Sequence, residues 1–375
     1  MKNRSLFYIA TMAMALCSIV SARAFADGAA YTMTNAADDN QIVVFTRSDD
    51  GLLTQVNTIS TEGKGSGGDI DPLGSQGALI LVGENKRQHG WRRHGDKHKK
   101  ALLLAVNAGS NDISVFRVAG ANIQLRDRMG SGGSFPVSVT AFDHIVYVLN
   151  NGAPANITGF RLDGKGRLHA IPHSTRLLGD GAYGQVAFGP QGKRLFITDK
   201  ANSRLLVYRV AHNGKPSAAP AITASAGAVP FGVDFDRKGH LLVVEAGANA
   251  VSSYSVNADG SLQVISASVP NGQIATCWLV VNRRGDIVTT NPGTNSLSAF
   301  HVDNATGQVS LLNGTAGAGN APLDVDMSNN GRFAYAVDPV AGGVDMFRVE
   351  NDGSLTALGV VDAGLAIYAQ GMAAY

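Results

Sequence analysis

Short apolar segments that each end on an aromatic residue recur along the chain. Each follows a polar residue and a turn of small residues, and the seven closing aromatics are Phe45, Phe116, Phe160, Tyr208, Tyr254, Phe300 and Phe347. They are spaced 71, 44, 48, 46, 46 and 47 residues apart. A period of about 40–50 residues built from short strands is typical of a β-propeller with one repeat per blade. The pattern therefore predicts an all-β, seven-bladed propeller.

Turn residues indicate four strands in each repeat. Five Asx-Gly pairs follow the aromatic-ended strands, at Asp50, Asp163, Asn213, Asp259 and Asp352. Asx-Gly accepts the positive φ of tight hairpins, so each pair marks the turn into an outermost strand. A second turn follows a short apolar strand at Gly192, Gly239, Gly285 and Gly331. We therefore expect four-stranded antiparallel blades with the short apolar strand innermost.

The two ends of the propeller are predicted to meet. The first repeat begins at Tyr31 with its second strand, so it lacks an innermost strand. The chain ends in QGMAAY from Gln370, which resembles QGALIL from Gln76 in the second repeat. We expect residues 370–375 to complete the first blade, because this closure removes the edges that an open ring would expose. Such a ring is one domain and is expected to be a monomer.

The N-terminus has the pattern of a secretory signal peptide. Lys2 and Arg4 precede an apolar run at residues 6–20, and small residues follow at 24–26. The run is too short to favour a transmembrane anchor. We expect residues 1–26 to be removed and residues 27–375 to form a periplasmic or secreted propeller. Only Cys277 then remains, which excludes an intramolecular disulfide.

A basic insertion at residues 84–100 breaks the spacing of the second repeat. It carries seven Lys and Arg against Glu84 and Asp96, although the whole chain has a net charge of only +2. The pair His94 and His98 would suit a metal only on a helix, which the glycines of the insertion disfavour, so we predict no metal site. The insertion is interpreted as a solvated loop or as a contact for polyanions.

Positions that differ between repeats are the candidates for function. The second strand ends on Asn or Asp in six repeats, where the side chain caps a turn, but on Glu245 in the fifth. The entrances to the innermost strands also vary, and they include Phe135, Pro136, Tyr183, Gln185, Phe231, Asp234, Cys277, Trp278, Leu323 and Asp324. We expect them at the channel mouth, where aromatic rings could stack on a ligand and polar groups could bind its hydroxyls. The alternative for Glu245 is a solvated or salt-bridged carboxylate, and the alternative for the aromatic residues is packing between blades.

Four segments of the chain resemble the propeller-fold lactonase family. They are VNAGSNDISVFRV (106–118), GQVAFGPQGKRLFITDK (184–200), PFGVDFDRKGHLLVVEAG (230–247) and ISASVPNGQIATCWLVV (265–281). The family includes the bacterial propeller-type 6-phosphogluconolactonase and the fungal carboxymuconate lactonising enzyme. The resemblance implies a seven-bladed propeller that hydrolyses or forms a lactone, with no cofactor.

The chain departs from the family where the lactone chemistry is implied to lie. In the motif Gly-Pro-Arg-His-x-x-Phe-x-Pro, Gly184 replaces the Arg and Gln185 replaces the His, whereas the Phe and the last Pro are kept. Lys200 stands where the family has a Glu, two residues before Asn202. Gln can neither transfer a proton nor balance the charge of a carboxylate.

We therefore place the candidate chemistry on other residues. Glu245 or Asp234 would be the general base, and Lys200 would stabilise the oxyanion or carboxylate. Asp199 is a further catalytic candidate. The candidate substrate-binding residues are Tyr183, Gln185, Phe231 and Trp278.

Two classes of function follow from these observations. One is a lactone hydrolase or lactone-forming cycloisomerase that acts on an unphosphorylated sugar or aromatic lactone. A phosphorylated lactone is an intracellular metabolite and a poor substrate for an exported protein. The other class is a non-enzymatic propeller that recognises a small ligand, a protein or a surface polymer through its channel mouth.

Overall fold

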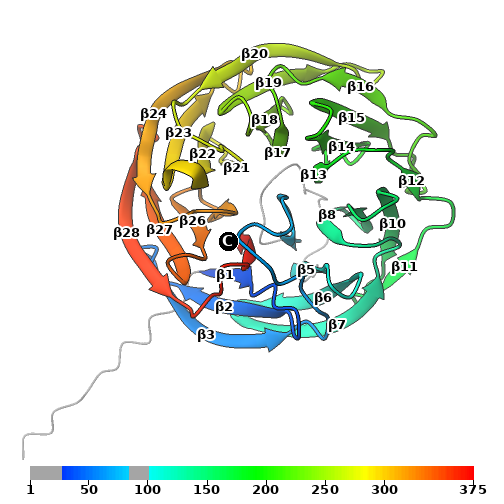
Figure 1. The fold of residues 1–375 in the computed structure, drawn as a ribbon, viewed down its shortest axis with the longest axis horizontal. Coiled ribbons are helices and arrows are strands. Elements are labelled where there is room, and N and C mark those ends of the chain that lie inside the picture. The colour runs from blue at the N-terminus through cyan, green and yellow to red at the C-terminus, as the bar shows by residue number, and fades with distance from the viewer. Residues whose placement is uncertain (1–27, 84–100) are drawn as a thin grey trace, which may run out of the picture.

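Seven antiparallel sheets are arranged as blades around one axis in the computed structural model, which confirms the predicted propeller (Figure 1). The structure describes residues 28–83 and 101–375. The predicted signal peptide and the basic insertion lie outside these residues. Within them, no helix is long and apolar enough to cross a membrane, and the helical content is the 3-10 turn η1 (Pro292–Thr294).

The strands of each blade follow one another from the axis outward to the rim of the ring. Blade 1 contains β29 (Gln370–Ala374), β1 (Gly28–Met33), β2 (Gln41–Arg47) and β3 (Leu53–Ser60). Blade 2 contains β4 (Leu79–Val82), β5 (Ala101–Asn107), β6 (Asp112–Ala119) and β7 (Asn122–Gly130). Blade 3 contains β8 (Pro136–Phe142), β9 (Ile145–Asn150), β10 (Asn156–Leu162) and β11 (Leu168–Ala170), and β12 (Arg176–Leu177) also pairs with β10.

The remaining four blades have four strands each. Blade 4 contains β13 (Tyr183–Phe188), β14 (Arg194–Asp199), β15 (Arg204–Arg209) and β16 (Ala221–Ala224). Blade 5 contains β17 (Pro230–Phe235), β18 (Leu241–Glu245), β19 (Ala250–Val256) and β20 (Leu262–Pro270). Blade 6 contains β21 (Trp278–Val281), β22 (Asp286–Asn291), β23 (Ser296–Val302) and β24 (Val309–Ala318). Blade 7 contains β25 (Val325–Met327), β26 (Phe333–Asp338), β27 (Gly343–Val349) and β28 (Leu355–Asp362).

The hydrophobic core lies between the faces of neighbouring blades. Every residue of β9, β22 and β26 is buried, whereas the outermost strands β3 and β7 are largely exposed. This explains why the second strand of each repeat is a nearly continuous apolar run: both of its faces pack against other sheets. The aromatic residues that close the third strands are all buried in these interfaces.

The C-terminal strand closes the ring as the sequence predicts. β29 pairs antiparallel with β1, with Ala30 opposite Ala374. The hydroxyl of Thr32 also donates to the carbonyl of Gly371 at 2.7 Å. β29 is also bound to blade 7, because the N–H groups of Gly371 and Ala374 donate to Asp324 and Asp326 at 3.1 and 2.9 Å.

Similar side-chain bonds join other neighbouring blades along the axis. Thr140 in blade 3 accepts from the N–H of Phe188 at 3.0 Å. Gln185 in blade 4 accepts from Val233 at 2.6 Å. Asp234 in blade 5 accepts from Val281 at 3.1 Å. Polar residues on the innermost strands therefore satisfy backbone donors of the next blade, which would otherwise face the channel unpaired.

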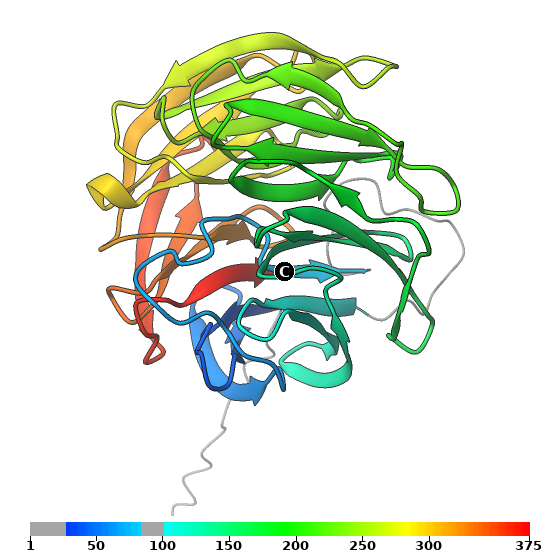
Figure 2. The ribbon, with the colours of Figure 1, turned by 45° about the vertical axis from the view of Figure 1, so that its right-hand side comes forward.

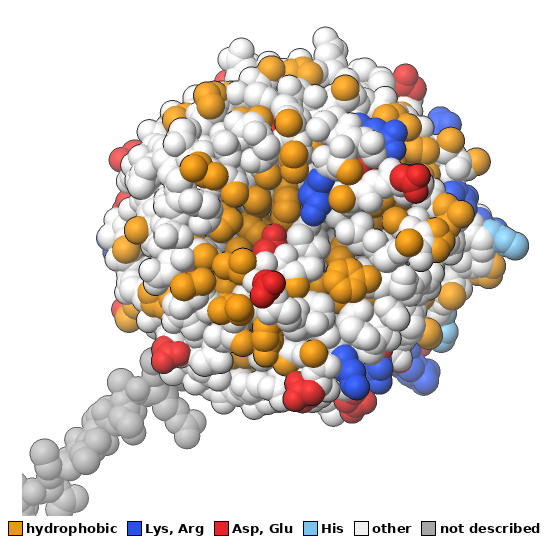
Figure 3. All heavy atoms as spheres, viewed as in Figure 1, with side chains coloured by type: hydrophobic (Ala, Val, Ile, Leu, Met, Phe, Trp, Pro, Cys, Tyr) orange, Lys and Arg blue, Asp and Glu red, His pale blue; other side chains and the backbone are white. Residues whose placement is uncertain are grey.

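One connection crosses the axis and was not anticipated from the sequence. Residues 61–78 link β3 to β4, and we call them the axial segment; it lies in blue over the middle of the ring (Figures 1 and 2). The N–H of Gln76 donates to the carbonyl of Gly184 at 3.0 Å, and the hydroxyl of Ser75 donates to Val137 at 2.7 Å. Leu73 and Ser75 are buried. The axial segment is thus bound to blades 3 and 4 at the axis; Figure 3 draws the same view as spheres, with hydrophobic side chains gathered around the middle of this face.

Candidate functional site

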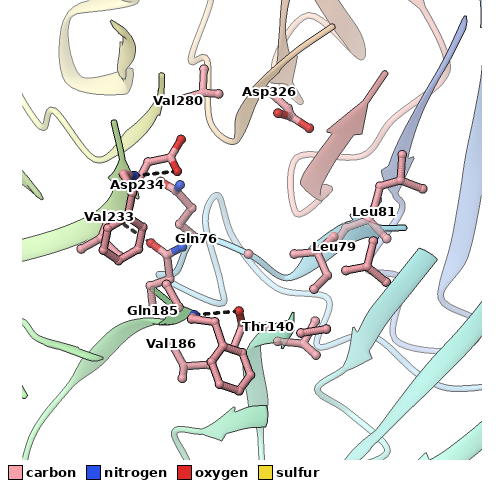
Figure 4. A pocket seen from close by; sticks show the side chains of 18 of the residues that line it. Gln76, Leu79, Leu81, Thr140, Gln185, Val186, Val233, Asp234, Val280 and Asp326 are labelled. Carbon is pink, nitrogen blue, oxygen red and sulfur yellow. Dashed lines mark hydrogen bonds between the residues drawn. The ribbon is translucent and has the colours of Figure 1, made fainter. Parts of the chain in front are cut away.

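A cavity of about 180 Å³ lies on the axis and is lined by the innermost strands of all seven blades (Figure 4). We call it the axial cavity. It begins at Gln76 of the axial segment. At its other end lie Gly83, which follows β4, Phe142, which ends β8, and Gly189, which follows β13. Its polar lining is formed by Gln76, Thr140, Gln185, Asp234, Asp324 and Asp326. Apolar residues such as Leu79 and Leu81 fill the rest of the wall.

The described lining of the axial cavity carries three carboxyl groups and no Lys, Arg or His. Asp324 is only 4% exposed, and this burial raises its pKa to about 7. The N–H of Gly371 opposes the shift, whereas the nearby Asp71 adds to it. A carboxyl group with a pKa near 7 is suited to proton transfer at neutral pH. The cavity can therefore supply a general base, and its carboxyl groups give it a negative electrostatic potential.

Two of the residues predicted from the sequence, Gln185 and Asp234, line this cavity together. Figure 4 shows both on the left of the cavity, with Asp326 at the top of the view and Thr140 in its lower part. The strand register shifts between Tyr183 and Val186 in β13, and again at the start of β17. Such irregularities redirect side chains out of regular pairing. The oxygens of Gln185 and Asp234 then bind the N–H groups of the next blade, as described above.

Two other predicted residues, Lys200 and Trp278, bind the axial segment, and Phe231 contacts both of them. The ammonium group of Lys200 donates to the carbonyl of Gly74 and lies 4.8 Å from the ring of Phe231. The indole N–H of Trp278 donates to Ser75 at 2.8 Å, and the rings of Phe231 and Trp278 meet edge-to-face at 5.0 Å. Burial lowers the pKa of Lys200, while Asp71 acts in the opposite direction. Their assignment to ligand binding or catalysis stays a prediction.

Asp199 and Tyr183 are placed outside the lining of the axial cavity. Asp199 is fully buried and forms an ion pair with Arg204 at 2.7 Å. The hydroxyl of Tyr183 donates to the carbonyl of Leu178 at 2.6 Å, and burial raises its pKa to about 12. Both side chains thus have partners in the scaffold of blade 4 or beside it.

Glu245 is fully buried and is surrounded by neutral donors. One carboxylate oxygen accepts from the hydroxyl of Ser225 at 2.9 Å and from the N–H of Gly227 at 2.7 Å. The other accepts from the hydroxyl of Ser268 at 2.5 Å. These contacts connect β18 to the chain that enters blade 5 and to β20. These hydrogen bonds give a structural reason why this repeat has Glu where the others have Asn or Asp. The catalytic role of Glu245 stays a prediction.

Two further lining residues were not among the candidate site residues: Asp324, which the sequence places at the entrance to an innermost strand, and Asp326. A signal for Asp326 was present, because it interrupts the apolar strand VDM just as Asp234 interrupts VDF. Alternation along a short innermost strand directs the middle residue toward the axis. Within residues 28–83 and 101–375, no three His, Cys, Asp or Glu side chains form a group that could hold a metal ion. Cys277 is buried, which raises the pKa of its thiol and disfavours the nucleophilic thiolate.

Comparison with known proteins agrees with this architecture. Residues 276–364 match the family model of the seven-bladed β-propeller lactonases. No curated protein matches this chain in sequence. The periplasmic gluconolactonase PpgL of Pseudomonas aeruginosa is 15% identical, with a TM-score of 0.69 over 92% of this chain and 99% of that one. A proposed 6-phosphogluconolactonase of Bacteroides fragilis is also 15% identical, with a TM-score of 0.70 over 92% of this chain and 97% of that one.

Function is not uniform among similar structures. A protein of Desulfotomaculum acetoxidans, described as functionally unknown, is 12% identical, with a TM-score of 0.67 over 92% of this chain and 98% of that one. At these identities the likeness establishes the fold alone. The chain is a seven-bladed β-propeller that resembles the propeller-fold lactonase family, and its residues 276–364 match the model of that family.

Proposed function

We propose that this protein hydrolyses an unphosphorylated lactone, of a sugar or of an aromatic acid, in the axial cavity. The observation that carries the proposal is the gathering of Asp234, Asp324 and Asp326 around one cavity in a chain that matches the lactonase family model. The similar protein of Pseudomonas aeruginosa, described as a gluconolactonase, supports an unphosphorylated sugar lactone as the first candidate.

Charge and size favour a small neutral ligand. Three carboxyl groups without a cation in the described lining would repel a phosphate group. The volume of about 180 Å³ is below the roughly 300–1,000 Å³ of pockets for drug-sized ligands, so a single ring is the appropriate size. The carboxylate product would be repelled by the same side chains, and this repulsion would assist its release.

The residues of the axial cavity suit each part of the hydrolysis. Asp324 would take a proton from water as the water oxygen attacks the lactone carbonyl carbon. Gln185 accepts a backbone N–H with its oxygen, which leaves its amide N–H groups to donate to the developing oxyanion. The carbonyl carbon–ring oxygen bond then breaks, and the ring oxygen takes the proton. The product is the open hydroxy acid, formed without the Arg-His pair of the family.

Turnover of a lactone panel by the mature protein tests this proposal. We expect hydrolysis above the buffer rate, and a reduction of roughly 100-fold or more in Asp324→Asn, because general-base catalysis is worth about 10²–10⁴. Asn can still accept the N–H of Gly371, so the ring can still close. Asp345→Asn is the matched control, since Asp345 is another buried acid of blade 7 but does not line the cavity.

A binding propeller is the second candidate, and a specific observation favours it. Gln185, Asp234 and Asp324 all serve as acceptors between blades, so their presence has a structural explanation. Binding of a lactone or sugar without turnover would establish this alternative and overturn the hydrolase. Full activity in Asp324→Asn would overturn the assignment of the base.

Export is also part of the proposal. The pattern of residues 1–26 supports a periplasmic or secreted protein, as does the description of the Pseudomonas aeruginosa protein as periplasmic. N-terminal sequencing of the mature protein should begin at Asp27, and a mature chain that retains Lys2 would overturn this. The monomeric state and contact of polyanions with residues 84–100 remain proposals that sedimentation and heparin binding can test.

A further inference from the structure

A second cavity, of about 310 Å³, lies between blades 4 and 5. The turn at residues 189–194 forms one side, and the turn at residues 238–240 forms the other. The rings of Phe196 and Phe235 meet edge-to-face at 5.0 Å between these sides and provide an apolar floor. We call this cavity the basic pocket, because Lys193, Arg194, Lys238 and His240 line it and its described lining contains no Asp or Glu.

The Nε–H group of Arg194 has no hydrogen-bond acceptor among the described residues. One of its terminal nitrogens donates to the carbonyls of Asn257 and Ala258, both at 3.0 Å, and so bridges blade 4 to blade 5. Its Nε atom is buried and has no hydrogen-bond partner among the described residues. A buried donor without an acceptor costs about 1–3 kcal/mol. Because this atom is buried, an anionic oxygen in the pocket would reach it after a movement of the Arg194 side chain, and would then satisfy it with a charge-assisted bond.

The acids near the basic pocket are already engaged. The carboxylate of Asp236 is buried; one oxygen binds Nδ1 of His240 at 2.6 Å, and the other accepts the N–H groups of residues 238–240. Because a carboxylate accepts, Nδ1 of His240 is the protonated nitrogen, which leaves Nε2 for another partner. Asp259 also interacts with Arg194, but its carboxylate is exposed and accepts from Ser261. The pocket therefore keeps a positive potential.

We propose that the basic pocket is a binding site for the carboxylate of a small hydroxy acid. The two lysines and Arg194 would hold the carboxylate, as cations do at anion sites. Gln191 and Ser255, which also line the pocket, would bind hydroxyl groups, and the aromatic floor would contact the carbon chain. These uncharged groups favour an organic hydroxy acid over a bare inorganic anion.

The position of the pocket connects it with the axial cavity. Gly189 and Phe235 line both, so the two spaces are adjacent at the ends of β13 and β17. The carboxyl groups of the axial cavity would repel a hydroxy acid, whereas the basic pocket would attract it. The identity of this acid as the product of lactone opening rests on the proposed function, but the binding itself does not.

Calorimetric titration with sodium gluconate tests the site without any turnover. We expect gluconate to bind the mature protein, and Lys193→Gln combined with Lys238→Gln to weaken it at least tenfold. Lys165→Gln combined with Lys215→Gln is the matched control, since it removes the same charge from turns outside the pocket. In protein labelled with ¹⁵N-arginine, the Nε–H resonance that Arg194→Lys removes should shift on titration.

The outcomes separate this inference from the proposed hydrolase. The site is overturned if gluconate does not bind, if both double variants weaken it equally, or if sodium phosphate binds as tightly. It is also overturned if Asp324→Asn abolishes gluconate binding while the pocket variant keeps it, because the acid then occupies the axial cavity. Retained gluconate binding in a protein that hydrolyses no lactone would leave the site standing and remove the hydrolase.

Discussion

Gln76 pairs with Leu279 through both polar atoms of its side-chain amide. Its Nε2 donates to the carbonyl of Leu279 at 2.9 Å, and the N–H of Leu279 donates to Oε1 at 3.0 Å. The two residues are 203 positions apart in the sequence. The amide thus satisfies both backbone groups of a residue on the inner edge of β21, as a neighbouring strand would do. The axial segment is therefore an integral part of the propeller.

This pairing predicts that Gln76→Ala destabilises the protein. The change leaves the N–H and carbonyl of Leu279 without these partners, and we expect a loss of about 1–3 kcal/mol in the free energy of unfolding. Urea unfolding measures it. Gln124→Ala, on the exposed face of β7, is the control and should change stability by less than about 0.5 kcal/mol. Equal stability of the two variants would contradict a structural role for Gln76.

A second prediction concerns Glu245→Gln. The carboxylate accepts from three hydroxyls and one N–H, so the amide nitrogen of Gln would face a group that now donates to Glu245. We expect a loss of about 1–3 kcal/mol, visible as a lower melting temperature. Any loss of activity should follow the loss of folded protein. If activity falls while the melting temperature is unchanged, Glu245 acts in the chemistry and not in the scaffold.

A third prediction arises from the carboxyl pair of blade 7. Asp345 is buried on β27 beside Asp338 of β26. The same place in blades 2 and 6 holds Ser114 and Ser298, whose hydroxyls accept from the Asn at the end of the second strand. Burial raises the pKa of Asp345 to about 8, and the charge of Asp338 adds to the shift.

The sign of the pH dependence follows from this shift. Between about pH 4 and pH 8 the folded state holds a proton that the unfolded state has lost, so stability falls as the pH rises through this window. Asp345→Ser should flatten that decline and stabilise the protein by about 1 kcal/mol at pH 9. Urea unfolding at pH 5, 7 and 9 measures both effects. Asp38→Ser, an exposed control, should keep the wild-type slope.

The repeat pattern was sufficient to predict the fold because it reports burial directly. Each blade buries its second and third strands, so the apolar runs and their closing aromatics recur with the period of the blade. The match between Gln76 and Gln370 also predicted closure correctly, since both residues begin an approach to an innermost strand.

The candidate site was predicted less completely, because its geometry depends on contacts without a sequence pattern. Residues 61–78 have no sequence pattern that predicts a path across the axis. This path places the carbonyls of Gly74 and Ser75 within hydrogen-bond distance of Lys200 and Trp278. Gln185 and Asp234 could be identified because they stand at entrances to innermost strands, where the residues differ from one repeat to the next. Asp324 stands at a strand entrance in the sequence, but its role in the cavity depends on burial, which the sequence does not report.

A fourth prediction tests the closure of the ring. Deletion of residues 370–375 removes β29, exposes the edge of β1, and takes away the N–H groups that Asp324 and Asp326 accept. We expect the loss of most of the ~5–15 kcal/mol that stabilises a typical domain, so that the protein unfolds or aggregates. Thr32→Val is the mild counterpart, because it removes only the bond to Gly371, and it should cost about 1 kcal/mol. A truncated protein that keeps the wild-type unfolding midpoint would exclude this clasp.

The last prediction concerns the pH dependence of lactone hydrolysis. If Asp324 is the general base, it must be ionised, and burial places its pKa at about 7. The hydrolysis rate should therefore rise with pH and reach half of its plateau near pH 7, whereas an exposed Asp would be ionised already above about pH 4. Initial rates between pH 5 and 8.5, corrected for the spontaneous opening of the lactone, provide the measurement. Asp324→Asn should remove both the activity and its pH dependence, and Asp345→Asn should keep both. A rate that is flat from pH 5 to 8 would assign the proton transfer to a group other than Asp324, even in an active enzyme.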